Sequence, residues 1–216
     1  MAPETAKQWE IGIKTSLFDS RLTGSLAFFD LTKQNVARPD PANPRFSLAT
    51  GEVRHRGVEF DIAGAISPDC NIIGSYAYLD SEIIKDSTQE YDNTGNLIGV
   101  NDGATGNRLA GTPRHTGSLW TSCNITQGRF QGLKLGAGVV ARGQNFTDQT
   151  HNELRLPGYA TVNFMLGYER SIGSSMLSFQ LNIDNLLDKT YFENGGSGGA
   201  NYGIPRTFLG SVRVEF

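Results

Sequence analysis

Long segments in which apolar and polar residues alternate one by one restrict the fold of this chain more than any other feature. A period of two over ten or more residues indicates a β-strand, because successive side chains of a strand point to opposite faces. In residues 175–187, for example, one face carries four apolar residues: Leu177, Phe179, Leu181 and Ile183. The predicted strands are 8–18, 21–31, 54–65, 70–81, 113–125, 130–143, 157–170, 175–187 and 204–216. They are longer than the strands of about five or six residues typical of globular proteins, and suit a tilted crossing of a bilayer.

The connections between these segments alternate strictly in length. The short ones, 19–20, 66–69, 126–129 and 171–174, contain turn residues such as Asp, Ser, Pro and Gly. The long ones, 32–53, 82–112, 144–156 and 188–203, are rich in Gly, Asn, Asp and Pro. Tight turns at one end of a sheet and long loops at the other are typical of outer-membrane β-barrels, with the turns in the periplasm and the loops outside the cell. A soluble β-sandwich does not require this alternation. The predicted fold is therefore all-β, an antiparallel transmembrane barrel segment.

The predicted topology places the end of the last strand in the periplasm and residues 1–7 in an extracellular loop. Nine strands that begin outside the cell would leave two unpaired strand edges, which lipid does not tolerate. We therefore expect an N-terminal part of the protein to be missing from this chain. The polar start, Met-Ala-Pro-Glu-Thr-Ala-Lys-Gln-Trp-Glu, lacks the apolar core of a signal peptide.

Composition agrees with this interpretation and excludes other classes. The mean hydropathy is −0.31, and no apolar run is long enough for a transmembrane helix. A net charge of −3 without a Lys/Arg-rich stretch argues against nucleic-acid binding. His55, His115 and His151 lack metal-ligand spacing, and no catalytic constellation stands out, so neither a resident metal nor an enzyme is expected. Aromatic residues that could form membrane-interface girdles are Trp9, Trp120, Tyr159, Tyr168 and Phe216.

The two cysteines, Cys70 and Cys123, lie at the start of one predicted strand and near the end of the next. Both positions are at the periplasmic end of neighbouring strands, so the pair could form a cross-strand disulfide in an oxidising compartment. The alternative is two isolated small residues. A Cα separation above about 7 Å would exclude the disulfide.

The C-terminal third carries two motifs that resemble those of a known family. Residues 185–191 read Asn-Leu-Leu-Asp-Lys-Thr-Tyr, and residues 203–207 read Gly-Ile-Pro-Arg-Thr at the start of the last strand. Together they resemble the C-terminal signature of TonB-dependent siderophore receptors, with Leu187 in place of a more usual Phe. Further segments that match in order are 8–14, 28–35, 56–60, 113–120 and 156–162.

This resemblance implies a 22-stranded barrel in the outer membrane of a Gram-negative bacterium, with an N-terminal plug and energy from a TonB complex. Neither the plug nor a TonB-engaging segment is recognised in this chain. The ferric siderophore would arrive already chelated, so no protein cofactor is implied. The alternatives are a TonB-dependent transporter of haem, cobalamin or a glycan, and a passive porin.

Two sets of residues follow as site predictions. The last strand ends on an aromatic residue and resembles the β-signal read by the outer-membrane assembly machinery, carried by Phe208, Val212, Val214 and Phe216. Aromatic and cationic residues at the extracellular strand ends are candidate ligand contacts, since ferric siderophores are bulky, often aromatic and often anionic: Tyr191, Phe192, Tyr202, Phe146 and Arg142. The alternative is that these residues only order the loops.

Overall fold

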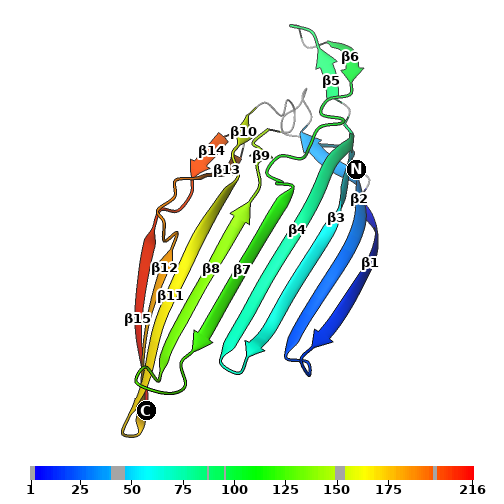
Figure 1. Ribbon diagram of the computed structural model, residues 1–216. Helices are drawn as coiled ribbons and strands as arrows, with labels where there is room; N and C mark the ends of the chain where they lie inside the picture. Colours follow the sequence, from blue (N-terminus) through cyan, green and yellow to red (C-terminus); the bar gives the residue numbers. More distant parts are fainter. Residues whose placement is uncertain (1–2, 40–46, 87, 95, 149–153, 197–198) are drawn as a thin grey trace.

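A computed structural model of the protein describes residues 3–39, 47–86, 88–94, 96–148, 154–196 and 199–216. In these residues nine strands form one antiparallel sheet (Figure 1), in the order β1-β2-β3-β4-β7-β8-β11-β12-β15. Their bounds are Thr5–Leu17, Leu22–Pro39, Ser47–Ser67, Cys70–Lys85, His115–Asn124, Leu133–Arg142, Tyr159–Ile172, Ser175–Asp184 and Thr207–Glu215. Each strand pairs with its predecessor in the sheet, and the nine predicted segments are confirmed as these nine strands.

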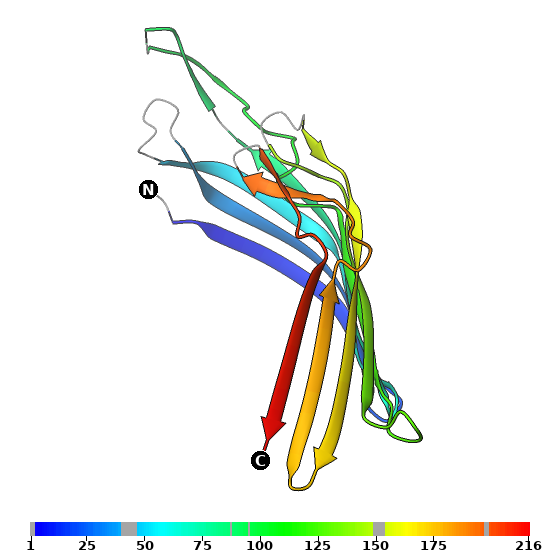
Figure 2. The same cartoon turned by 90° about the vertical axis from the view of Figure 1, so that its left-hand side faces the viewer.

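Short and long connections lie at opposite ends of the sheet, as the sequence predicts. The turns after β1, β3, β7 and β11 lie at the bottom of Figure 1 together with the C-terminus, and the long loops lie at the top with the N-terminus. In the turn after β1, Phe18, Asp19 and Ser20 all have positive φ, so the chain reverses within a few residues. Figure 2 shows that the sheet curves strongly from β1 to β15 instead of lying flat.

The long connections contain structure that the sequence did not predict. β2, β3 and β4 extend beyond their predicted ends towards the loop side, where polar residues interrupt the apolar alternation. Three short hairpins form within segments predicted as loops: β5 (Thr88–Tyr91) with β6 (Leu97–Asn101), β9 (Asn145–Phe146) with β10 (Arg155–Leu156), and β13 (Phe192–Gly196) with β14 (Gly199–Tyr202). Their strands are only two to five residues long, too short for a period of two to be recognised in the sequence.

The register of the ladder places the apolar side chains on one side of the sheet, here called the apolar face. Residues directly opposite one another in neighbouring strands share a face. One continuous row runs Ile13, Leu26, Phe60, Tyr76 across β1 to β4. The apolar face carries Ile11, Ile13, Leu26, Phe28, Val58, Phe60, Ile62, Tyr76, Tyr78, Leu119, Val139, Val162, Phe164, Leu166, Tyr168, Leu177, Phe179, Leu181, Ile183, Phe208, Val212 and Val214.

The opposite side, here called the polar face, carries mostly charged, hydroxyl and amide side chains. Examples are Glu59 and Asp61 on β3 and Asn163 on β11, each between residues of the apolar face. Ser75 and Ser118 share a hydrogen bond of 2.9 Å on this face. Trp120 also lies here, opposite Gly138, so its predicted place in a girdle of the apolar face is wrong. The missing side chain of Gly138 leaves room for the Trp120 ring, which a Cβ would contact.

No second layer covers the apolar face among the described residues. Ile13 is 71% exposed and Val212 64% exposed, although both lie in regular strands. Among the described residues, Val53, Ile83 and Ala104 form a small buried apolar cluster beneath the loop that follows β4, and Leu22 and Leu156 are buried elsewhere. No helix in the described part of the chain is long and apolar enough to cross a membrane. An uncovered apolar face backed by a polar one is the arrangement of a barrel wall between lipid and an aqueous lumen.

Cys70 and Cys123 lie directly opposite each other in the β4–β7 ladder and form a disulfide. Their Cα atoms are 4.1 Å apart, and their sequence separation is 53. The bond lies at the turn end of the apolar face, and it adds a covalent link between two paired strands that the backbone connects only through a long loop.

We predict that replacing both cysteines by serine lowers the stability of the folded protein by about 2–4 kcal/mol, because the bond restricts the unfolded chain. The midpoint of urea unfolding in detergent measures this effect. The wild-type protein treated with a reductant is the control and should match the variant. An unchanged midpoint for both would contradict the prediction.

Candidate ligand-binding rim

The loop end of β8 and β11 places a cation and an aromatic ring side by side. Arg142 and Tyr159 are directly opposite each other in the ladder, and both belong to the polar face. Tyr159 was predicted as a girdle residue of the apolar face, and the register shows that this is wrong. The two residues lie where the polar face meets the long loops.

Tyr191 and Glu193 come to the same place from the segment after β12. The rings of Tyr159 and Tyr191 stack with centroids 4.1 Å apart, and the Tyr159 hydroxyl donates a hydrogen bond of 3.0 Å to Glu193. A Cβ on Gly203 would clash with the Tyr191 ring, so the glycine allows the ring to lie against the backbone of the returning chain. We call Arg142, Tyr159, Tyr191 and Glu193 the rim cluster.

The other predicted ligand contacts form separate pairs. The rings of Phe192 and Tyr202 lie 5.0 Å apart across the β13–β14 hairpin. The Arg155 guanidinium lies 5.3 Å from the centre of the Phe146 ring across β9–β10. β10 contacts β13, and the backbone of Gly111 donates a hydrogen bond to the carbonyl of Phe146. Three of the long connections therefore meet at this part of the rim.

The structure thus brings the five predicted residues into one region but not into a single cluster. Arg142 and Tyr191 belong to the rim cluster, whereas Phe192, Tyr202 and Phe146 contact neighbours within their own hairpins. Glu193 and Arg155 also belong to this region although the sequence did not indicate them, and Tyr159 has another role than the predicted one. The alternation could have placed Tyr159 correctly, since its neighbour Ala160 belongs to the apolar face.

The signature residues after β12 form a clamp that closes the long connection 185–206. Asn185, at a φ of 50°, is buried, and its amide nitrogen donates to the carbonyls of Lys189 and Ile204 at 2.9 and 3.1 Å. Its amide oxygen accepts from the backbone N–H of Lys189. The Asp188 carboxylate accepts from the backbone N–H of Arg206 at 3.0 Å and pairs with the Arg206 side chain. The two ends of the connection are therefore held together, which fixes Tyr191 and Gly203.

Below the rim, the polar face is hollowed between β3 and β8. This depression has a volume of about 430 Å³, and Glu59, Asp61 and Arg142 line it together with hydroxyl side chains. Arg142 belongs both to the rim cluster and to the lining of this depression. A ligand held at the rim cluster would therefore lie next to the depression on the polar face.

The hairpin β5–β6 projects from the loop end of the sheet (Figure 2) and has a turn built on Asp92. The Asp92 carboxylate accepts hydrogen bonds from the Thr94 hydroxyl at 2.7 Å and from the backbone of Asn96 at 2.8 Å. These hydrogen bonds lower the pKa of Asp92 below its ordinary value, and the bond from the Thr94 hydroxyl has the largest effect. In the part of the chain that the structure describes, no three metal-binding side chains meet, and His151 lies outside that part.

Comparison with known proteins identifies the family. Residues 1–186 match the family described as TonB dependent receptor-like, beta-barrel. The chain belongs to the TonB-dependent receptor family. The nine-stranded sheet is therefore part of an outer-membrane β-barrel of a Gram-negative bacterium, and the family consists of transporters and not of enzymes.

Curated members of the family show similarity along most of the chain. It is 33% identical over 191 residues to the metal-pseudopaline receptor CntO of Pseudomonas aeruginosa, which covers 88% of the chain and 25% of that receptor. It is 32% identical over 217 residues to the ferrichrome outer membrane transporter/phage receptor of Escherichia coli, covering 100% of the chain and 27% of that protein. The chain thus spans about a quarter of the length of these relatives.

Solved structures show the same fold. The siderophore receptor PiuA of Acinetobacter baumannii superimposes with a TM-score of 0.78 at 29% identity, covering 96% of the chain and 28% of PiuA. The ferric preacinetobactin receptor BauA of the same species gives a TM-score of 0.82 at 24% identity, covering 100% of the chain and 30% of BauA.

We predict that Gly203→Ala displaces the Tyr191 ring from the stack with Tyr159, because the added methyl group occupies the place of the ring. The near-ultraviolet circular dichroism of the tyrosines should change while the sheet signal stays. Gly210→Ala is the matched control, since a Cβ there meets nothing within 4 Å. Identical spectra for the two variants would show that Gly203 has no such role.

Proposed function

We propose that this chain forms part of an outer-membrane receptor that binds ferric siderophores or related metal chelates and imports them with energy from TonB. The observation that carries the proposal is the rim cluster, in which an arginine, two stacked tyrosines and a glutamate that accepts from one of them lie at the extracellular end of the polar face. The identity of about 30% to receptors named for ferrichrome, ferrioxamine B and metal-pseudopaline supports the same cargo class.

The chemistry of the rim suits such chelates. Tyrosine rings offer flat apolar surface with a polar tip, and the guanidinium of Arg142 offers charge to anionic groups. A chelate supplies all the ligands of its metal, so the receptor needs shape and charge and no coordinating side chains. Phe192, Tyr202, Phe146 and Arg155 would add contacts from the neighbouring hairpins.

The runner-up is import of another cargo, such as haem, cobalamin or a glycan, by the same energised route. The relatives favour metal chelates over these. A passive porin is less consistent with membership of the TonB-dependent family.

The last strand is the proposed assembly signal. Phe208, Val212 and Val214 lie on the apolar face of β15, which forms one edge of the described sheet. An edge strand with a continuous apolar face can pair with another strand. This supports recognition of β15 and of the terminal Phe216 by the assembly machinery.

The test uses the intact receptor that contains this chain, purified in detergent and titrated with ferrichrome, ferrioxamine B and ferric citrate. Alanine replacement of the five predicted residues should weaken binding of the recognised chelate at least about tenfold, since each lost aromatic or cationic contact contributes about 0.5–2 kcal/mol. The variant replaces Tyr191, Phe192, Tyr202, Phe146 and Arg142.

Tyr168→Ala, on the apolar face of β11, is the control and should leave the affinity unchanged. Unchanged binding in the five-residue variant would overturn the assignment of the rim. Failure of all three chelates to bind the wild-type receptor, together with binding of haem, cobalamin or a glycan, would favour the runner-up.

A further inference from the structure

A row of charged residues crosses the apolar face at its extracellular end. Asp30 on β2, Arg56 on β3 and Asp80 on β4 are directly opposite one another in the ladder. They share their face with Phe28, Val58 and Tyr78, which lie one step nearer the turn end. The row therefore lies on the outside of the barrel wall and not in the lumen.

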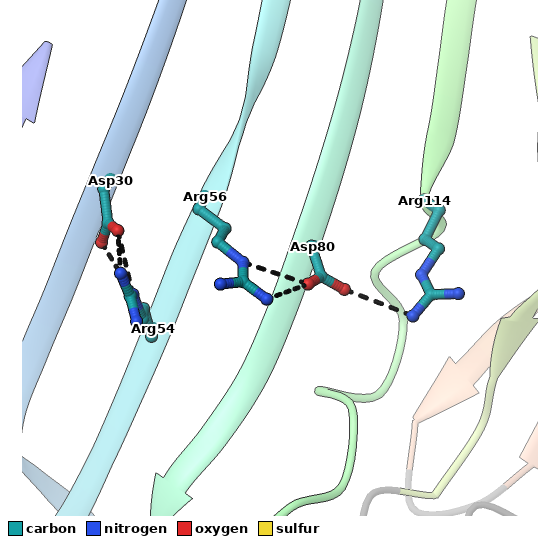
Figure 3. A network of polar contacts seen from close by, with 5 residues as sticks. All are labelled: Asp30, Arg54, Arg56, Asp80 and Arg114. Atoms are coloured by element: carbon teal, nitrogen blue, oxygen red, sulfur yellow. Dashed lines mark hydrogen bonds and ion pairs between the residues drawn. The ribbon is translucent and has the colours of Figure 1, made fainter.

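Ion pairs within the row hold three arginines in place, and the residues come from β2, β3, β4 and the segment before β7 (Figure 3). Arg54 donates through Nε to both oxygens of Asp30 at 2.9 and 3.0 Å. Arg56 donates through Nη2 to Asp80 at 3.1 Å, and Arg114, just before β7, reaches the other oxygen of Asp80 at 3.3 Å. We call Arg54, Arg56 and Arg114, with Asp30 and Asp80, the arginine row.

The carboxylates of the row are covered while the guanidinium groups remain open. The side chains of Asp30 and Asp80 are 11% and 19% exposed, against 41%, 52% and 50% for Arg54, Arg56 and Arg114. Each arginine uses at most two of its three side-chain nitrogens in these contacts. The carboxylates thus orient the arginines along the sheet and leave donors directed outward.

Two further charged residues belong to the same neighbourhood. Glu82 is opposite Arg54 in the ladder, and Arg108 interacts electrostatically with Asp80 and Arg114. Four arginines then face three carboxylates, and Lys7, in the same register row as Arg54 and Glu82, adds to this surplus of positive charge. This surplus suits an anionic partner.

The position of the row along the strands indicates which layer of the membrane surrounds it. Trp9 is directly opposite Asp30 and is among the exposed aromatic residues of the sheet. Tyr78 lies one step below Asp80 on the same face. Trp and Tyr on the lipid side mark the boundary between hydrocarbon and headgroups. The arginine row therefore lies at headgroup level, on the side of the long extracellular loops.

We propose that the arginine row binds the phosphate group of an anionic lipid in the outer leaflet, with the acyl chains lying on the apolar face beneath it. Arginine presents paired N–H donors that match phosphate oxygens. Phe28, Val58 and Phe60, directly below the row, provide the surface for the chains. The lipid would hold β2, β3, β4 and the segment before β7 together from outside.

The test measures lipid binding to the intact receptor by native mass spectrometry in a neutral detergent. Dioleoyl phosphatidic acid should bind wild type, and Arg54→Gln/Arg56→Gln/Arg114→Gln should weaken it at least about tenfold, since each basic residue near a headgroup contributes about 1 kcal/mol. Dioleoyl phosphatidylcholine should not distinguish the two proteins. A matched control removes three arginines at the turn end, Arg21→Gln/Arg129→Gln/Arg170→Gln, and should bind phosphatidic acid like wild type.

Equal phosphatidic acid binding by wild type and the arginine-row variant would overturn the proposal, as would an equal loss in the control. Displacement of the lipid by millimolar inorganic phosphate would indicate a site for free phosphate and would also contradict it. If the triple variant does not fold, Arg114→Gln alone, which lies outside the strand pairing of the sheet, should still weaken binding about fivefold. Chelate binding at the rim should be the same in all variants, so this test is independent of the proposed function.

Discussion

The continuous antiparallel ladder is the constraint on which the rest of this structure depends. Lipid offers no partners for backbone N–H and C=O groups, so every spanning strand must be paired with a neighbour. Once the ladder fixes the register, alternation sorts each side chain to the apolar or the polar face. The same register places Cys70 opposite Cys123, Arg142 opposite Tyr159 and Asp30 opposite Arg56. The disulfide, the rim cluster and the arginine row are therefore three consequences of one pairing pattern.

The loop end of the sheet carries the features that distinguish this receptor segment from a plain barrel wall. Asn185 and Asp188 close the connection between β12 and β15, so a segment of many residues presents Tyr191 at a fixed place. Polar side chains at this end of the sheet face a different environment on each of its two faces. On the polar face Arg142 and Tyr159 meet the aqueous lumen, and on the apolar face the arginine row meets the headgroups.

Much of the fold could be predicted because period-two alternation and connection length are properties of the sequence alone. They gave nine strands, their order and the ends at which turns and loops lie. The hairpins β5–β6, β9–β10 and β13–β14 could not be predicted, since their strands of two to five residues are too short to show a sustained period of two. The rim was predicted in part. Arg142 and Tyr191 were named, whereas Glu193 depends on a contact with Tyr159 that no spacing in the sequence encodes.

The central claim is that the register separates a lipid face from an aqueous face along each strand. Nitroxide labels placed one at a time at positions 58 to 62 of β3, in the intact receptor reconstituted in bilayers, test it most directly. Cys70 and Cys123 of this chain are joined in the disulfide and do not compete for the label. The account predicts that oxygen, which is concentrated in lipid, relaxes labels at positions 58, 60 and 62, while a water-soluble nickel chelate relaxes those at 59 and 61. Equal accessibility at all five positions, or a period other than two, would contradict it.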